Sequence, residues 1–187
     1  IHVSLQDGAG RNVFAAGDAV DNPMLRHAIG GLAATLDEAM AIFAPNLNAF
    51  RRFRPDQFVP VNRSWTVNNR SGAFRIPAGS PATRRIEHRV AGAEANPYLV
   101  LAAILAGIHH GLQQRLDPGP PATGNAGHRV DVTLPLDWAQ ALGRLQAGAI
   151  LGDYLGSEYL QLYCETKTGE LAKFQRTISP QEYQWYL

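Results

Sequence analysis

Apolar residues that recur every three or four positions predict that most of this chain is helical. The first such run extends from Met24 to Phe43 and has Pro23 at its start, a position that favours helix initiation. Its Gly30-Gly31 pair indicates close packing against a neighbouring element, not a phosphate-binding loop, because no strand precedes it. Further helical runs extend from Asn96 to Leu116, Leu136 to Gly148, Ala149 to Leu155 and Ser157 to Phe174, and a last one begins at Ser179 and carries Tyr183, Trp185 and Tyr186.

Short stretches in which apolar and polar residues alternate predict β-strands. Ile1 to Phe14 is typical of a hairpin with its turn at Asp7 to Gly10, and the other strands are centred on Trp65 to Val67, Phe74 to Ile76 and Ile86 to Val90. No internal repeat or linker divides the chain. We therefore expect an α+β fold in which residues 1–187 form a single domain, with antiparallel strands backed by helices.

The composition, with 45% hydrophobic and 18% charged residues, is that of a soluble globular protein. A net charge of +1 argues against a nucleic-acid partner, because no general basic surface is expected. The longest apolar run, Leu99 to Ile108, is too short to span a membrane. The single cysteine, Cys164, excludes an internal disulfide, and no signal peptide is visible, so we expect a cytoplasmic protein.

Positive charge is concentrated between Arg51 and Arg89. This stretch holds nine of the 17 Lys and Arg residues, all nine of them Arg, and only two carboxylates, Asp56 and Glu87. Arginine is favoured over lysine where planar, bidentate contact with a carboxylate or phosphate is needed. The partner that we expect is therefore a small anion.

Arg85, Glu87 and Arg89 alternate with apolar Ile86 and Val90, so a strand would place the three charged side chains on one face. Two interpretations of this row are open, an ion-pair ladder on an exposed sheet and an anion pocket. If the pocket holds phosphates, a divalent cation that bridges Glu87 to phosphate oxygens would explain the carboxylate. The arginine-only composition favours the pocket and predicts a nucleotide site.

The same stretch contains a series of specific motifs, which lie in one order within 31 residues: Asn69-Arg70-Ser71, Arg75-Ile76-Pro77, Arg85-Ile86-Glu87, Arg89 and Asn96-Pro97-Tyr98-Leu99. This series resembles the C-terminal catalytic region of the glutamine synthetase family. Ile1 to Leu5 is similar to that family's His-x-His-x-Ser segment, and Asn48 to Arg52 to its Asn-Ser-Tyr-Lys-Arg segment. The resemblance covers essentially the whole chain.

The resemblance implies a role for each matching residue. Arg70 would be the catalytic residue that stabilises the phosphoryl group in transfer, and Glu87 would bind the metal, Mg²⁺ or Mn²⁺. ATP would be the co-substrate, and glutamate and a small amine would be the other partners. The remaining roles are ATP binding for His2, Ser4, Arg75 and Arg85, and glutamate binding for Arg52 and Arg89.

The resemblance also implies that the chain is the C-terminal part of a longer catalytic domain. It begins in the middle of a motif, so the upstream metal-binding glutamates and a small β-grasp domain would be absent. We expect residues 1–187 alone to be inactive. The full-length chain would form a homo-oligomer, a dodecamer of stacked rings, and we expect the aromatic C-terminal helix to make an intramolecular or subunit contact.

Two positions depart from the family pattern. Where ammonia-using members carry a glutamate in a flap over the substrate, this chain has Phe58, which cannot attract ammonium or accept its proton. An aromatic wall admits the methylene chain of a larger amine, as in members that ligate glutamate to putrescine. Alternatively, Phe58 only packs and another acid acts from the absent half. Ala82 stands where many members have lysine, which leaves recognition of the base or ribose open.

Three functions follow from these observations. The first is an ATP-dependent ligase that joins glutamate to an organic amine, and the second is a glutamine synthetase that uses ammonia. The third is a non-catalytic scaffold, which the clustered and mutually repelling arginines argue against. We assign no chemistry to the Pro/Gly-rich loop from Asp117 to Val132, and we interpret His109 and His110 as surface or capping residues.

Overall fold

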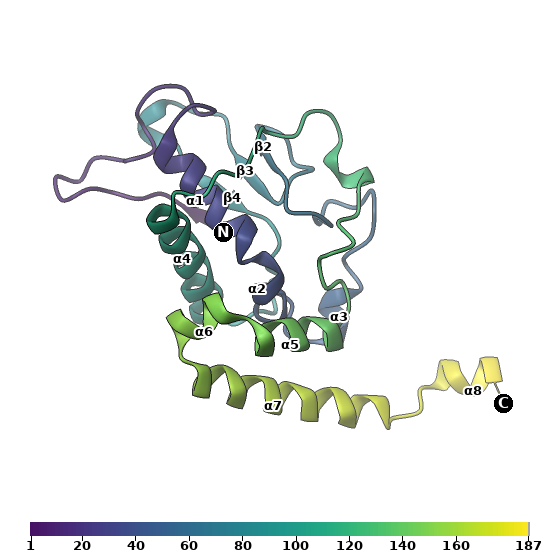
Figure 1. Ribbon diagram of the computed structural model, residues 1–187. Helices are drawn as coiled ribbons and strands as arrows, with labels where there is room; N and C mark the ends of the chain where they lie inside the picture. The colour runs from purple at the N-terminus through teal and green to yellow at the C-terminus, as the bar shows by residue number, and fades with distance from the viewer. Residues whose placement is uncertain (187) are drawn as a thin grey trace.

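The strands form one small mixed sheet that lies against the helices (Figure 1). The computed structural model describes residues 1–186, and the strand order is β1-β4-β3-β2. The elements are β1 (His2–Val3), α1 (Pro23–Ala34), α2 (Leu36–Phe43), α3 (Leu47–Phe50), β2 (Trp65–Val67), β3 (Phe74–Ile76), β4 (Ile86–His88), α4 (Pro97–Gln114), α5 (Trp138–Ala147), α6 (Ala149–Leu155), α7 (Ser157–Gln175) and α8 (Pro180–Tyr186). Short 3₁₀ turns, η1 (Pro81–Thr83) and η2 (Ala126–His128), lie in the loops.

The expected antiparallel pairing is found for β1, β4 and β3 but not at one edge of the sheet. β1 and β3 run antiparallel to β4, but β2 runs parallel to β3. The reason is the loop between them, which folds back along β2 because Asn68 takes a left-handed conformation and Thr66 Oγ1 donates a hydrogen bond to the Asn69 carbonyl (2.6 Å). The chain therefore re-enters the sheet in its original direction, and this loop carries Arg70 at the sheet edge.

The predicted N-terminal hairpin forms, although most of it is not regular strand. Backbone hydrogen bonds join Val13 to Leu5 and Asp7 to Arg11, as the predicted turn requires. Only the first segment, β1, enters the sheet, where His2 lies opposite Glu87 on β4. The hairpin therefore places His2 at the edge of the sheet, beside the charged residues of β4.

The helix predicted from Met24 to Phe43 is two helices, α1 and α2, separated at Thr35. The Thr35 hydroxyl donates to the Gly31 carbonyl (3.0 Å), a local bond that competes with helix continuation. The predicted close packing at the glycine pair is confirmed, since α1 crosses α4 with Gly31 against Gly107 and Gly111. A Cβ atom on Gly31 would overlap the carbonyl oxygen of Gly107.

The C-terminal helices lie on the side of the molecule away from the sheet. α5 packs between α2 and α7, and α7 buries Leu160, Cys164 and Leu171. α8 projects beyond the end of α7, away from the body, and the side chains of Tyr183, Trp185 and Tyr186 on it are exposed (Figure 1). Among the described residues, no helix has the length and apolar character needed to cross a membrane.

His88 is buried under the sheet with no hydrogen-bond partner. Its ring lies 4.5 Å from Phe43 and 5.5 Å from Phe74, measured between centroids, and neither ring nitrogen is bonded within residues 1–186. Burial lowers the pKa of His88 to about 3 from an ordinary value of 6.5. The ring is therefore neutral in the folded protein and acts as part of the core.

We predict that replacing Gly31 by Ala strongly destabilises the fold. The new methyl group would push α1 away from α4, at a cost of about 3 kcal/mol in unfolding free energy. Gly143→Ala is the matched control, because nothing lies within 4 Å of its Cβ position on α5 and alanine favours a helix by about 1 kcal/mol. Chemical denaturation that gave both variants equal stability would contradict the packing argument.

We predict that His88 makes the fold sensitive to acid. Below pH 6.5 the unfolded chain takes up a proton at this position and the folded chain does not until about pH 3, so stability falls as pH falls through this window. The slope is about 1.4 kcal/mol for each pH unit. Urea denaturation between these pH values should show a smaller loss for His88→Phe, and parallel curves for the two proteins would refute the assignment.

Candidate functional site

The centre of the charged face is an ion-pair network around Glu87 on β4. Arg75 Nη1 donates to Glu87 Oε2 at 2.7 Å from the neighbouring strand, and Arg89 Nε lies 3.8 Å from Oε1. The predicted alternation is confirmed, because Ile86, His88 and Val90 are buried on the opposite face. One carboxylate therefore balances two guanidinium groups.

Of the two arginines predicted to flank Glu87, Arg89 lies beside it, but Arg85 does not, and Arg75 takes the place of Arg85. Arg75 and Glu87 are partners in the β3–β4 register, and side chains directly opposite one another on neighbouring strands lie closer than those two positions apart on one strand. Arg85 instead donates from Nε to His2 Nδ1 at 3.0 Å and from Nη1 to the Thr83 carbonyl at 3.1 Å.

The charges of this network set the protonation of its members. Partial burial would raise the pKa of the Glu87 carboxyl, but the hydrogen bond from Arg75 and the charges of Arg75 and Arg89 outweigh it and hold this pKa below its usual range. Partial burial lowers the pKa of His2, with Arg85 adding to the shift and Glu87 opposing it. Because Arg85 donates to Nδ1 of His2, the neutral ring carries its proton on Nε2.

Arg89 holds two loops together through backbone carbonyls. Its Nη1 donates to the Arg70 carbonyl and, at 3.1 Å, to that of Gly72, and its Nη2 donates to the Phe58 carbonyl at 3.0 Å. Burial lowers the pKa of this guanidinium, and Glu87 opposes that shift. The structure thus connects Glu87 through Arg89 to the backbone at both Phe58 and Arg70.

Arg70 and Phe58 line one cavity of roughly 450 Å³, a size usual for small-molecule sites. The Arg70 guanidinium is exposed and makes no hydrogen bond or ion pair within residues 1–186, so it is available to an anion. The Phe58 ring is 83% exposed, so little of it is packed against the rest of the described chain. The other lining residues are Asp56, Gln57, Asn69, Ser71, Gly124 and Asn125.

The loop from Asp117 to Val132, to which the sequence pattern assigned no chemistry, forms one wall of this cavity. Asn69 Nδ2 donates to the Gly124 carbonyl at 2.6 Å, and the Ala126 amide donates to Ser71 Oγ at 2.9 Å. The pairing joins segments about fifty residues apart, and no local motif in the loop signals it. The sequence signal that could point to this contact is the asparagine-rich loop after β2, because side-chain amides need hydrogen-bond partners.

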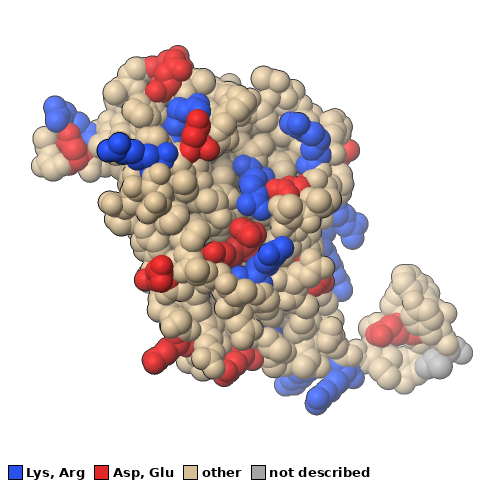
Figure 2. All heavy atoms as spheres, in the orientation of Figure 1, with Lys and Arg blue, Asp and Glu red and all other residues tan. Residues whose placement is uncertain are grey.

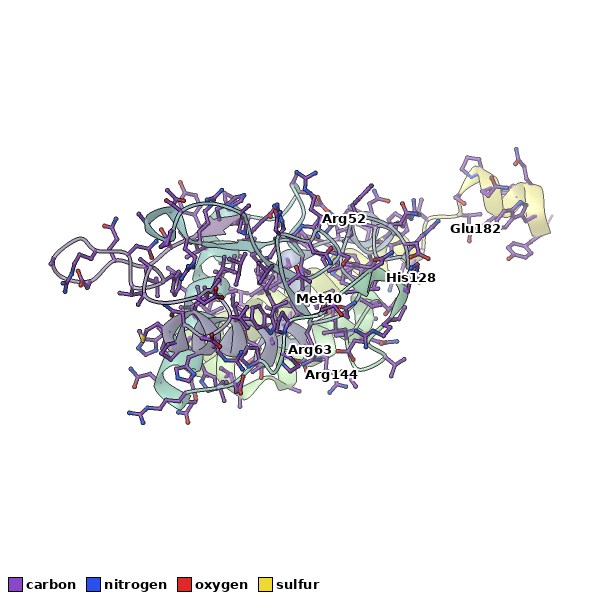
Figure 3. The ribbon with its side chains drawn as sticks, turned by 90° about the horizontal axis from the view of Figure 1, so that it is seen from above. Met40, Arg52, Arg63, His128, Arg144 and Glu182 are labelled. Carbon is purple, nitrogen blue, oxygen red and sulfur yellow. The ribbon has the colours of Figure 1, made fainter. Side chains whose placement is uncertain are left out.

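Other predicted site residues lie outside the cavity. Arg52 Nε donates to the Ala49 carbonyl at 3.1 Å and lies 3.6 Å from Glu94 Oε1, with the guanidinium over the Phe53 ring. Figure 3 shows Arg52 close to the surface of the body, whereas Met40 lies in the interior. Ser4 is exposed beyond β1. These positions are compatible with a substrate site that extends past the cavity.

On the charged face, Glu87 is the carboxylate that could bind a divalent cation. No group of three or more His, Cys, Asp or Glu side chains is placed to hold a metal within residues 1–186. Mg²⁺ is often bound by one or two carboxylates together with substrate phosphates and water, and Glu87 fits one such position. A cation held there would neutralise phosphate charge beside Arg75.

Elsewhere on the surface the charged side chains of both signs are spread over the molecule, and several of them are paired. On the face in Figure 2, basic and acidic side chains lie beside one another and form no continuous basic patch. Arg63, for example, donates to Asp131 at 2.8 Å, and Arg84 donates to the Phe14 carbonyl at 2.8 Å. This distribution agrees with a small anion as ligand.

An arginine-lined sheet face, a carboxylate that balances it and a neighbouring cavity are suited to a small anionic ligand. The family model for the glutamine synthetase catalytic domain matches residues 1–186, and the chain belongs to this family. The sequence is 41% identical to gamma-glutamylputrescine synthetase PuuA of Escherichia coli (strain K12), over 100% of this chain and 40% of that protein.

Two further comparisons extend this assignment. Gamma-glutamylethanolamide synthetase GlnA4 of Streptomyces coelicolor is 32% identical over 97% of this chain and 39% of its own length. A solved GmaS/ADP complex superposes with a TM-score of 0.85 at 27% identity, covering 99% of this chain and 44% of that one. The chain thus spans about two fifths of the length of the curated relatives that it matches.

We predict that Glu87→Gln destabilises the protein by about 3 kcal/mol, because two largely buried guanidinium groups would lose their counter-charge. Glu170→Gln is the control, since its ion pair with Lys167 on α7 is half-exposed and contributes less than about 1 kcal/mol. The measurement is the urea unfolding free energy of both variants. Equal losses would show that the network around Glu87 has no special role in the fold.

Proposed function

We propose that the protein that contains this chain is an ATP-dependent ligase that joins the γ-carboxylate of glutamate to an organic amine. The observation that carries the proposal is Phe58, exposed on the same cavity as the unpaired guanidinium of Arg70. A cationic group beside an aromatic wall suits a reaction between an acyl phosphate and an amine with an apolar chain. The relatives named for putrescine and ethanolamide products support the same class of reaction.

The first step would transfer the γ-phosphoryl group of ATP to the glutamate γ-carboxylate, which releases ADP and leaves γ-glutamyl phosphate. In this step Arg70 would stabilise the phosphoryl group, while Arg75 and Arg85 hold the ATP phosphates. Phosphoryl transfer depends on positioning and charge neutralisation, and one well-placed arginine contributes about 10³-fold in rate. The bound metal ion would supply further charge neutralisation at the phosphates, with Glu87 as one ligand.

ATP is expected to extend from these arginines toward β1. His2 and Ser4 lie on that side, and the neutral His2 ring, held by Arg85, has its Nε2 proton available to a nucleotide oxygen. The ADP in the solved GmaS complex supports a nucleotide site in this fold. Glutamate would bind near Arg52 and Arg89, with Arg89 acting also through the loops that it connects.

The second step would be attack of the amine nitrogen on the acyl carbon. The attacking ammonium group must first lose a proton, and phosphate then leaves as the amide bond forms. Phe58 cannot accept this proton, so its contribution is to bind the carbon chain of the amine. A glutamine synthetase that uses ammonia is the second candidate, since the family model alone supports it equally.

The exposed aromatic residues of α8 support an oligomer. A helix that projects from the body with Trp185 70% and Tyr186 76% exposed has more apolar surface than a monomer usually presents. We infer that it contacts another subunit of a homo-oligomeric ring assembly. The buried, unpaired Cys164 agrees with a reducing, cytoplasmic location.

The test is phosphate release by the full-length protein with ATP, Mg²⁺ and glutamate, comparing ammonium with putrescine, spermidine, ethanolamine and simple monoamines. We expect one organic amine to exceed ammonium by about tenfold or more in kcat/KM. Preference for ammonium would instead indicate a glutamine synthetase, and no release with any amine would indicate a scaffold.

We predict that Phe58→Glu shifts this preference toward ammonium by restoring a carboxylate that attracts the cation and accepts its proton. Phe58→Leu is the control, because it keeps an apolar wall of similar size. The measured quantity is the ratio of kcat/KM for the organic amine to that for ammonium, expected to fall about tenfold in Phe58→Glu only. The same ratio in both variants would show that residue 58 does not select the amine.

A further inference from the structure

Asp56 is the only carboxylate among the residues that line the cavity, and Arg70 is the only cation. All other lining residues are neutral, and the Phe58 ring belongs to the same wall. A ligand that fills this cavity therefore meets a positive group, an aromatic surface and a negative group. Such an arrangement suits a molecule that has a cationic group at one end and an apolar chain. The other end of that molecule would react beside an anion bound by Arg70.

The Asp56 carboxylate is held in place from the opposite wall. Its Oδ1 lies 2.5 Å from His128 Nδ1, and His128 Nε2 lies 3.1 Å from Asn125 Nδ2. An amide can only donate from Nδ2, so Nε2 is the acceptor and Nδ1 carries the proton that is donated to Asp56. Nδ1 of His128 therefore orients the Asp56 carboxylate, which has no Arg or Lys partner within residues 1–186.

The backbone at this position is fixed as well. The Asp56 amide donates to the Gly127 carbonyl at 3.3 Å, which ties the two loops together beside the cavity. Figure 3 shows His128 at the margin of the body and not in its interior, so the pair lies where a ligand from solvent has access. The second carboxylate oxygen, Oδ2, has no hydrogen-bond partner within residues 1–186.

We propose that Asp56, positioned by His128, binds the distal ammonium group of an α,ω-diamine whose other amino group is ligated. The inference rests on the proposed function and narrows its substrate class from organic amines to diamines. A distal amino group has a pKa near that of lysine, about 10, and is therefore charged at neutral pH. Its methylene chain would lie along Phe58, and the reacting amino group would lie toward Arg70.

The alternative role for Asp56 is proton acceptor for the reacting amine itself, in place of a flap carboxylate. The two roles differ in what they predict for substrates. A site for the distal ammonium group favours only amines with a second charged group. A proton acceptor instead promotes the reaction of every amine, ammonium included. Diaminobutane and n-butylamine have the same carbon chain and differ only in the distal amino group, so they separate the two roles.

The experiment measures kcat and KM of the full-length protein for 1,4-diaminobutane and n-butylamine. In the wild type we expect diaminobutane to be favoured in kcat/KM by about tenfold or more, as a charge-assisted hydrogen bond allows. Asp56→Asn should reduce that ratio about tenfold through KM for the diamine, and raising the salt concentration should reduce it in the wild type. His128→Gln should reduce it by a smaller factor, because Asp56 keeps its charge.

Asp153→Asn, on α6 and outside the cavity, is the control for removing an exposed carboxylate. Circular dichroism of each variant checks that the fold is kept. If the wild type ligates both amines equally well, the proposed ligase stands and the Asp56 site is refuted. If Asp56→Asn lowers kcat for diaminobutane, butylamine and ammonium by the same factor, Asp56 is the proton acceptor and the inference is wrong. If only ammonium is ligated, the proposed function fails with it.

Discussion

The charged face of this domain depends on one carboxylate, Glu87, set between Arg75 and Arg89. Arginines placed this close on a partly buried sheet would repel one another, and burial would penalise each of their charges. Glu87 offsets both effects and keeps the guanidinium groups in defined orientations. The rest of the site is arranged around this local balance of charge.

Arg89 connects the charged sheet face to the neighbouring loops through hydrogen bonds to their carbonyl groups. The strands are only two or three residues long, so the sheet itself presents few side chains, and the functional surface is made largely of loops. Because Arg89 is fixed by Glu87 and donates to the Phe58 and Arg70 carbonyls, the aromatic wall and the loop that carries Arg70 are positioned together. Loops of this length would otherwise be the most mobile part of the domain.

The proposed chemistry divides between two neighbouring regions. The sheet face with Arg75, Arg85 and Glu87 is suited to phosphates, and the cavity with Phe58 and Asp56 is suited to an amine. Arg70 lies at the cavity, on the loop that leaves the sheet, so it can serve the reacting centre between the two. An acyl phosphate formed on one side would be within reach of a nucleophile held on the other, which is the geometric requirement of a two-step ligase.

The sequence alone determined features that depend on local periodicity and family motifs. These include most of the helices, the alternation that buries His88 and places Glu87 on the opposite face, and the glycine contact of α1. Tertiary structure alone decided the pairing of Arg75 with Glu87, the parallel edge strand, and the contact of Asp56 with His128. The physical reason is range: periodicity records which face of its own element a residue occupies, whereas strand register and loop contacts depend on residues far apart in the chain.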